Sequence, residues 1–257
     1  MSLTQQLAAL RERSTELTQI IAGLSSEEWQ GETNCPPWRV RELAAHLVTS
    51  GRGFVNSITR GLAGNLDPPP RSGAELAEAD PPTVARALAD VTDAFEALYA
   101  GLSEGQLETI CWHRRGNRSV RWYAAHRLAE VAFHGWDLET SLGRSPVFDE
   151  STAKLLLPTL LESNVPRTYA AWLSTERGGG ERYLLQVAED ESLSWLVTID
   201  PEVLHVRRGS GPVDLRIAAS AADLALLVYG RKDVHTLPHV EGDRSVVERF
   251  TQIFPRP

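Results

Sequence analysis

The chain has 257 residues, enough for one large domain or two of modest size, and we expect two. Hydrophobic residues make up 42% of the chain and charged residues 23%, which is typical of a globular protein and excludes a disordered one. The formal net charge of −8 argues against nucleic acid as a partner, because phosphate binding needs clustered positive charge.

Four segments in the first 140 residues carry apolar side chains at helical spacing. In the first, residues 3–24, leucines and isoleucines follow alternating steps of four and three, with Ser14 in one slot, so that one apolar stripe results. The other three are expected at residues 38–62, directly after Pro36 and Pro37, at residues 84–102 and at residues 126–139. Loops rich in proline and glycine separate the last three, so the simplest packing is a four-helix bundle.

The pattern changes after residues 143–146. A helical stretch at residues 149–163 precedes four segments of β-type composition and two further helices, at 182–188, 194–200, 203–208, 213–219, 220–230 and 243–254. The sequence therefore predicts an α plus α+β protein with two domains, a helical bundle over residues 1–146 and an α+β domain over residues 147–257.

The segment HRLAEVAFHGWDLE, residues 126–139, carries four polar side chains on one face. At about 100° per residue, His126, Asp137, Glu130 and His134 fall within about 80° of one another. Their neighbours on this face are apolar, and buried carboxylates and imidazoles need partners, which a metal ion can supply. Glu130 and His134, four residues apart, have the spacing of a helical ligand pair.

A third ligand is expected from the second helix, where His46 stands beside Leu43 and Leu47 on the apolar face. Two histidines and one carboxylate leave an open coordination position, as in catalytic zinc sites, although nickel or iron suits the same donors. His126 and Asp137 would then support the ligands or face the substrate. Spacing alone leaves open the alternative that all of these are hydrogen-bonded core side chains.

Two cysteines and seven tryptophans offer other chemistry. Cys35 and Cys111 fit neither a disulfide framework nor a multi-cysteine zinc motif, and we expect both to be free, small buried hydrophobic residues. The tryptophans are expected mostly in the core, because a stacking platform for nucleic acid would need a basic groove.

Three motifs carry a resemblance to a known family. They are CPPWRVRELAAHL at residues 35–47, RLAEVAFHGWDL at residues 127–138, and AADLALLVYGR followed by VEGD within residues 221–243. In order and spacing they resemble the mycothiol-dependent maleylpyruvate isomerases, in which a DinB-like metal-binding four-helix bundle precedes a sterol-carrier-like α+β domain. Trp112, His113 and His126 are not part of these motifs.

The resemblance implies an enzyme whose metal ligands are His46, Glu130 and His134, whose metal is zinc and whose thiol cosubstrate is mycothiol. It also implies active-site roles for Asp137 and Arg231. The metal-bound thiolate would attack a small electrophile, giving isomerisation or a stable conjugate. Asp137 or His126 could move the proton, and Arg231 could face a substrate carboxylate.

Two other functions share these residues. A metal hydrolase would use a metal-bound water in place of the thiolate. A non-enzymatic module would keep the ligands only to bind metal or another ligand. No apolar stretch approaches the roughly 20 residues that span a bilayer, so we expect a cytoplasmic protein without a membrane partner.

Overall fold

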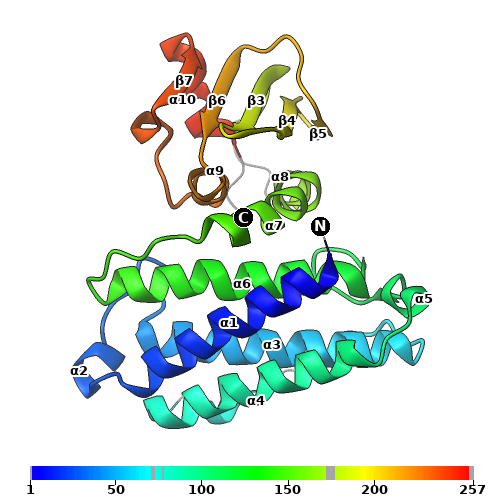
Figure 1. Cartoon of the computed structure of the whole chain (residues 1–257), viewed down its shortest axis with the longest axis vertical. Coiled ribbons are helices and arrows are strands. Elements are labelled where there is room, and N and C mark those ends of the chain that lie inside the picture. The colour runs from blue at the N-terminus through cyan, green and yellow to red at the C-terminus, as the bar shows by residue number, and fades with distance from the viewer. Residues whose placement is uncertain (1, 71–72, 77, 172–176, 255–257) are drawn as a thin grey trace. The chain divides into compact units, whose positions relative to one another are not determined.

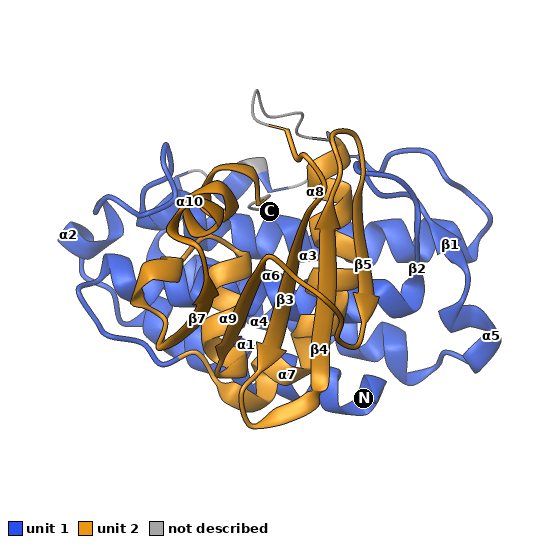
Figure 2. Ribbon diagram, turned by 90° about the horizontal axis from the view of Figure 1, so that it is seen from above, with its two compact units in different colours: residues 1–147 blue, residues 148–257 orange. Residues whose placement is uncertain are grey.

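The computed structural model describes residues 2–70, 73–76, 78–171 and 177–254 (Figure 1). It divides into two compact units, residues 1–147 and residues 148–257, which Figure 2 shows in different colours. The first unit is helical apart from two very short strands, and the second combines a sheet with helices.

Four long helices build the first unit, and they are α1 (Leu3–Ala22), α3 (Val40–Leu62), α4 (Pro81–Ala100) and α6 (Val120–Ser141). Helices α1 and α3 each contact both α4 and α6, so the four close into a bundle around one core (Figure 1). The predicted four-helix bundle is therefore present.

The apolar stripe of α1 is buried as predicted. Leu10, Ser14, Leu17 and Ile21 lie in the core at steps of four and three. The helix begins where Ser2 accepts a hydrogen bond from the backbone N–H of Gln5, whose side chain in turn caps the Ser2 backbone. Local capping and the core-facing stripe thus agree on the same helix.

Helix α3 begins at Val40, later than the sequence indicated. The segment before it turns back on itself, because Glu32 pairs with Arg39 and the Trp38 N–H donates to the Cys35 carbonyl. Pro36 and Pro37 therefore lie in a turn and not in the first turn of the helix. This turn brings Cys35 and Trp38 towards the site described below.

Several short elements of the first unit were not predicted. They are α2 (Ser26–Trp29), a 3-10 turn (Ala74–Leu76), α5 (Glu104–Leu107), β1 (Ile110–Cys111) and β2 (Arg118–Ser119). Strands β1 and β2 pair antiparallel, and the loop between them falls in a stretch that the sequence showed only as a glycine-rich loop. Two-residue strands are too short to leave a periodic signal.

The second unit opens with a helical segment formed by α7 (Glu150–Thr159), a π-helical turn (Leu160–Asn164) and α8 (Val165–Ala171). Its sheet has five strands, which are β3 (Glu181–Val187), β4 (Asp190–Ile199), β5 (Leu204–Arg208), β6 (Leu215–Ala219) and β7 (His239–Gly242). Their order is β5-β4-β3-β6-β7, with β3 and β6 parallel and the other pairs antiparallel. Strand β7 is a further element that the sequence did not reveal.

Three helices of this unit, α7, α8 and α9 (Ala221–Val228), lie on one side of the sheet (Figure 1). A 3-10 turn (Val234–Thr236) and α10 (Arg244–Ile253) complete the unit. Strand residues at the centre of the sheet are buried, including Tyr183, Leu185, Trp195 and Ile217. Together with the helical bundle, this mixed unit gives the α plus α+β class that the sequence predicted.

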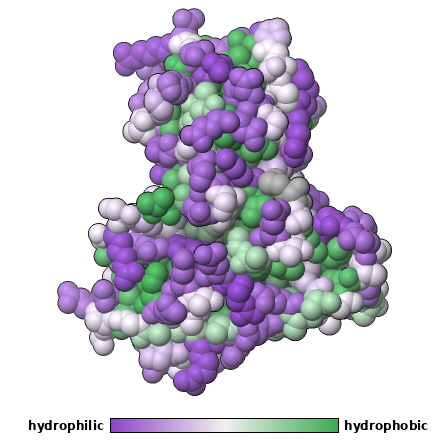
Figure 3. All heavy atoms as spheres, viewed as in Figure 1, coloured by the Kyte–Doolittle hydropathy of each residue, from purple (hydrophilic) through white to green (hydrophobic). Residues whose placement is uncertain are grey.

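The surface shown in Figure 3 is largely hydrophilic, with small apolar areas between polar side chains. Within the described residues, no helix combines the length and the apolar character needed to cross a membrane.

Candidate metal centre

Helices α3 and α6 bring together the three predicted ligands. His46 Nε2 lies 3.0 Å from Glu130 Oε2, and His134 Nε2 lies 4.0 Å from the same oxygen. One nitrogen from each histidine and one oxygen of Glu130 all lie within 4.8 Å of one another. The set offers two imidazoles and one carboxylate, the donors that suit zinc and leave a position open.

Each side chain reaches this point because of helix geometry. Glu130 and His134 are one turn apart on α6, so their side chains stand on one face. His46 comes from the inward face of α3, between the buried Leu43 and Leu47. All three ligand side chains keep a small exposed fraction, between 16% and 25%, so the centre is reachable from outside.

Neighbouring histidines favour the carboxylate form of Glu130. Burial alone would raise its pKa, but the hydrogen bond with His46 and the charges of His126, His46 and His134 hold the pKa well below its ordinary value. His126 Nε2 lies 3.8 Å from Glu130 Oε1, on the side away from His134 along the helix. A carboxylate that stays ionised is what metal ligation requires.

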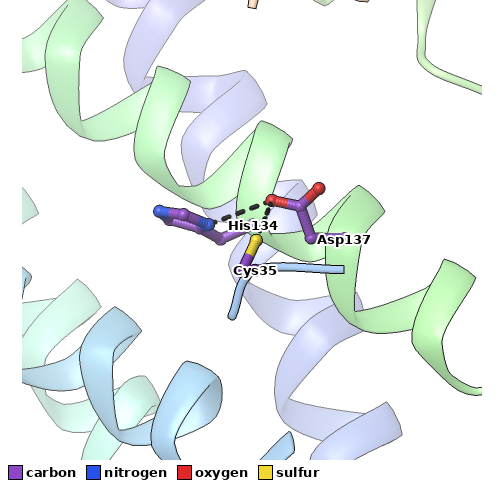
Figure 4. Close-up of side chains that lie close together, drawn as sticks. All are labelled: Cys35, His134 and Asp137. Carbon is purple, nitrogen blue, oxygen red and sulfur yellow. Dashed lines mark hydrogen bonds and ion pairs between the residues drawn. The ribbon is translucent and has the colours of Figure 1, made fainter. Parts of the chain in front are cut away.

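Asp137 lies behind the centre, enclosed by hydrogen-bond donors (Figure 4). Its Oδ2 is 3.1 Å from His134 Nδ1 and 3.2 Å from Cys35 Sγ, and its Oδ1 accepts from Asn34 Nδ2 at 3.2 Å. The residue is fully buried, with 0% of its surface exposed. Both carboxylate oxygens therefore face protein groups and not a cavity.

This arrangement fixes the orientation of His134. If Nδ1 carries the proton and donates it to Asp137, Nε2 keeps its lone pair and points towards Glu130 and His46. Carboxylates in this position commonly orient metal-binding histidines. The contact suits a role of Asp137 in orienting His134, and this role, like the proton transfer that the sequence also allowed, stays a prediction.

A second group of metal-capable side chains overlaps the first, because Cys35 and Asp137 also lie close to His134. Cys35 and Asp137 do not border the cavity described next, and Asp137 is closed off from solvent. An open coordination position needs access, so the group of His46, Glu130 and His134 fits catalysis better.

A cavity of about 750 Å³ opens beside the centre. Its wall is formed by helices α3 and α6, the proline-rich stretch before the Ala74–Leu76 turn and the β1–β2 loop. Helices α3 and α6 contribute His46 and Glu130, and the loop contributes Trp112, His113 and Arg114. His126 also lines the cavity. A cavity of this size can hold a small organic molecule.

Aromatic side chains pack around the histidines. The Trp38 ring lies 4.6 Å from the His46 ring, and Trp122 stacks on His126 with ring centroids 4.2 Å apart. His113 meets His126 edge to face at 5.5 Å. The prediction that tryptophans are mostly core is therefore wrong here, because Trp38 and Trp122 are only half-buried and flank site histidines.

The other tryptophans divide in the same way. Trp29 and Trp195 are buried, Trp112 and Trp136 are half-buried, and Trp172 lies outside the described residues. The two cysteines also differ. Cys111 is buried as predicted, and burial raises its pKa to about 11. Cys35 is half-buried and contacts Asp137, so the predicted burial is wrong for Cys35, whereas neither cysteine forms a disulfide, as predicted.

Arg127 was not predicted as a site residue, although it opens the motif that carries Glu130. It is 1% exposed, and its Nη1 donates to the Leu47 carbonyl at 2.8 Å and to Ser50 Oγ at 3.2 Å. Burial lowers the pKa of Arg127 to about 10, against the charge of Glu130. The contacts tie α6 to the turn of α3 that follows His46, so Arg127 sets the spacing of the two helices at the ligands.

Arg231 belongs to the second unit, at the end of α9. Its Nη1 donates to the Tyr229 carbonyl at 2.6 Å, and its guanidinium lies 5.8 Å from the centre of the Tyr229 ring. The active-site role that the resemblance gives Arg231 stays a prediction.

Comparisons with known proteins give a family match for the helical unit. The sequence model of the mycothiol maleylpyruvate isomerase N-terminal domain matches residues 10–139. Two uncharacterized proteins, from two strains of Mycobacterium tuberculosis, are each 24% identical to the chain over 253 residues, 90% of this chain and 87% of the relative.

Two solved structures share the fold. The crystal structure of the mycothiol-dependent maleylpyruvate isomerase is similar with a TM-score of 0.64 and 15% identity, over 90% of both chains. A histidine-to-alanine mutant of that enzyme gives the same TM-score at 16% identity, again over 90% of both chains. At these identities the similarity concerns the fold.

Proposed function

The chain belongs to the mycothiol maleylpyruvate isomerase family, and on this basis we propose that it is a metal-dependent enzyme that uses mycothiol to attack a small electrophile. Membership confirms the predicted family, and the predicted fold class and enzyme class agree with it. The reaction itself, an isomerisation or a thiol transfer, is the content of the proposal.

One observation carries the proposal most directly. The ligand atoms of His46, Glu130 and His134 lie within 4.8 Å of one another beside a cavity of about 750 Å³. These three residues would hold zinc, and a divalent ion there would favour the thiolate form of a thiol at its open position. The cavity offers room for the electrophile next to that thiol.

The residues around the ligands would divide the remaining work. Asp137 would accept the Nδ1 proton of His134 and hold its ring in place. His126, whose Nε2 lies 3.8 Å from Glu130 Oε1 at the cavity wall, would take up the proton that the thiol releases. Proton acceptance and ligand orientation are thus assigned to different side chains.

The electrophile would decide the outcome. Addition of a thiolate to an unsaturated acid turns a double bond into a single bond, which can rotate before the thiolate leaves, so the product is an isomer. Displacement of a leaving group gives a stable conjugate instead. Both outcomes use the same thiolate and the same cavity.

The proposal is tested by titrating mycothiol into zinc-loaded protein in a calorimeter, with the zinc content measured on the same sample. The wild-type protein should bind mycothiol, and His46→Ala should lose both zinc and mycothiol binding. His239→Ala is the matched control, since His239 is exposed on β7. Unchanged melting of both variants would show that folding is intact.

Two results would contradict the proposal. Retention of zinc by His46→Ala would remove the ligand assignment. Normal zinc content without mycothiol binding in the wild-type protein would favour a metal hydrolase or a non-catalytic metal-binding module.

A further inference from the structure

The loop between β1 and β2 forms one part of the cavity wall, separate from the proposed ligands. Trp112, His113 and Arg114 of this loop line the cavity, and the His113 ring contacts the ring of His126 at 5.5 Å. His126 precedes Glu130 by one helical turn, which corresponds to about 6 Å along the axis. The cavity thus runs along the first part of α6, from Glu130 past His126 to the loop.

The charges on this wall are unlike those of the whole chain. The chain has a net charge of −8, yet among the described residues the titratable side chains that line the cavity are one arginine, three histidines and one glutamate. The glutamate, Glu130, is already engaged by His46. The end of the cavity at the loop is therefore its positive end, and a cavity focuses such a field on a bound molecule.

Arg114 differs from the neighbouring arginines. Arg121 forms ion pairs with Glu104 and Glu108, and Arg118 donates to the Asn117 carbonyl and lies over Trp122. For the exposed Arg114, no such ion pair or hydrogen bond links its guanidinium to another side chain of the described residues. Its planar group is therefore ready to bind an anion from the cavity.

We infer that Arg114 is a specificity-determining residue that binds a carboxylate of the electrophile at the loop end of the cavity. This inference rests on the proposed function, because it takes the reacting carbon to lie near His46 and Glu130. A guanidinium binds a carboxylate through two parallel N–H···O hydrogen bonds, which fixes orientation as well as charge. The apolar walls of Phe54 and Trp112 suit the unsaturated part of such an acid.

The distance along α6 narrows the substrate class further. With His126 between Glu130 and the loop, the bound carboxylate lies several bonds away from the reacting carbon. A probe of this contact therefore needs a carboxylate that is separated from the reacting carbon by several bonds.

The test uses cis,cis-muconate, an extended unsaturated dicarboxylate, and its uncharged dimethyl ester as probes for calorimetric titration of the zinc-loaded protein. Arg114→Gln should weaken muconate binding at least tenfold and leave binding of the ester within twofold. The muconate affinity of Arg114→Lys should lie between those of the wild-type protein and Arg114→Gln, since lysine keeps the positive charge but lacks the planar guanidinium group. Arg115→Gln is the matched control, because it removes one charge from the same loop at a residue that does not line the cavity.

Three outcomes overturn the inference alone, provided that zinc and mycothiol bind normally. They are no muconate binding by the wild-type protein, equal binding by Arg114→Gln and wild type, and an equal loss in Arg115→Gln, which would mean that only the net charge of the loop matters. Failure of the wild-type protein to bind zinc or mycothiol would instead overturn the proposed function.

Discussion

The two units of the molecule differ in the kind of polar side chain that they bury. In the helical unit the buried polar side chains include charged or titratable ones, Arg127, Asp137 and His113, next to the half-buried ligands on α3 and α6. In the sheet unit the buried polar side chains among the described residues are neutral, namely Asn164, Thr168, Gln186 and Ser194. Burying a charged group costs free energy, so the presence of two such groups on α6, with His113 in the β1–β2 loop, marks this part of the molecule as the candidate site.

The same contrast holds for metal-capable groups. Within the described part of the chain, both groups that could hold an ion lie in the helical unit and share His134. The sheet unit relies instead on apolar packing, with Trp195 at its centre. A substitution in the sheet unit should therefore leave metal binding unchanged, and a substitution of a proposed ligand should leave the stability of the sheet unit unchanged.

The largest expected effect is the loss of the metal in Glu130→Ala. Removing the carboxylate leaves two histidines without their shared partner, and zinc binding should fall below detection, by more than about 100-fold, since even supporting residues contribute that much. Metal content after dialysis and competition with a chelator measure this. Glu108→Ala is the matched control, because Glu108 is exposed and forms an ion pair with Arg121. A Glu130→Ala protein that keeps zinc would remove the contrast between the units.

The sequence predicted these ligands because two independent patterns met. Steps of four residues placed Glu130 and His134 on one face of α6, and His46 stood among the apolar residues of α3. Helical periodicity reports which face is inward, and a bundle has few ways to bring two inward faces together. The four helices and the grouping of these three side chains can therefore be predicted from the amino-acid sequence alone, whereas their role as metal ligands stays a prediction.

The second prediction concerns the sheet unit. Trp195 is fully buried on β4, and its Nε1 donates to Glu162 Oε1 at 2.8 Å. Trp195→Ala should destabilise this unit by about 3–5 kcal/mol through the cavity it leaves and the lost hydrogen bond. Urea unfolding monitored by amide hydrogen exchange on β3 and β4 measures the change.

The zinc affinity of Trp195→Ala should stay within twofold of wild type, because no predicted ligand lies in the sheet unit. A matching fall in zinc affinity would show that the two units fold as one and would erase the contrast between them. Leu185→Ala, at another buried position of the sheet, should give the same pattern with a loss of stability of about 2–5 kcal/mol.

Other parts of the candidate site could not be predicted from the sequence. Cys35 and Asp137 are 102 positions apart, and their contact depends on the turn before α3, which local patterns did not reveal. Strands β1 and β2 are two residues long, so the sequence predicted only a loop between two helices in the stretch that carries Arg114. Contacts made by irregular segments follow from tertiary packing, and no period in the sequence encodes them.

The third prediction tests the role of Asp137. Asp137→Asn keeps the shape of the side chain but replaces one acceptor oxygen with a donor, so His134 loses the carboxylate that fixes its ring. Zinc affinity should fall about 10–100-fold, with the protein still folded. Chelator competition measures the affinity. An unchanged affinity would reduce Asp137 to a buried packing residue.

The smallest expected effect belongs to Cys35→Ser, and it separates the two overlapping metal-capable groups. A serine hydroxyl can donate to Asp137 as the thiol does, at 3.2 Å in the native protein, so stability should change by less than about 1 kcal/mol. Zinc affinity should stay within threefold of wild type, because Cys35 is not among the proposed ligands. A serine oxygen is a much poorer zinc ligand than a thiolate. A large loss of zinc in Cys35→Ser would therefore move the ion to the group of Cys35, His134 and Asp137, whereas a small one leaves it with His46 and Glu130 beside the cavity.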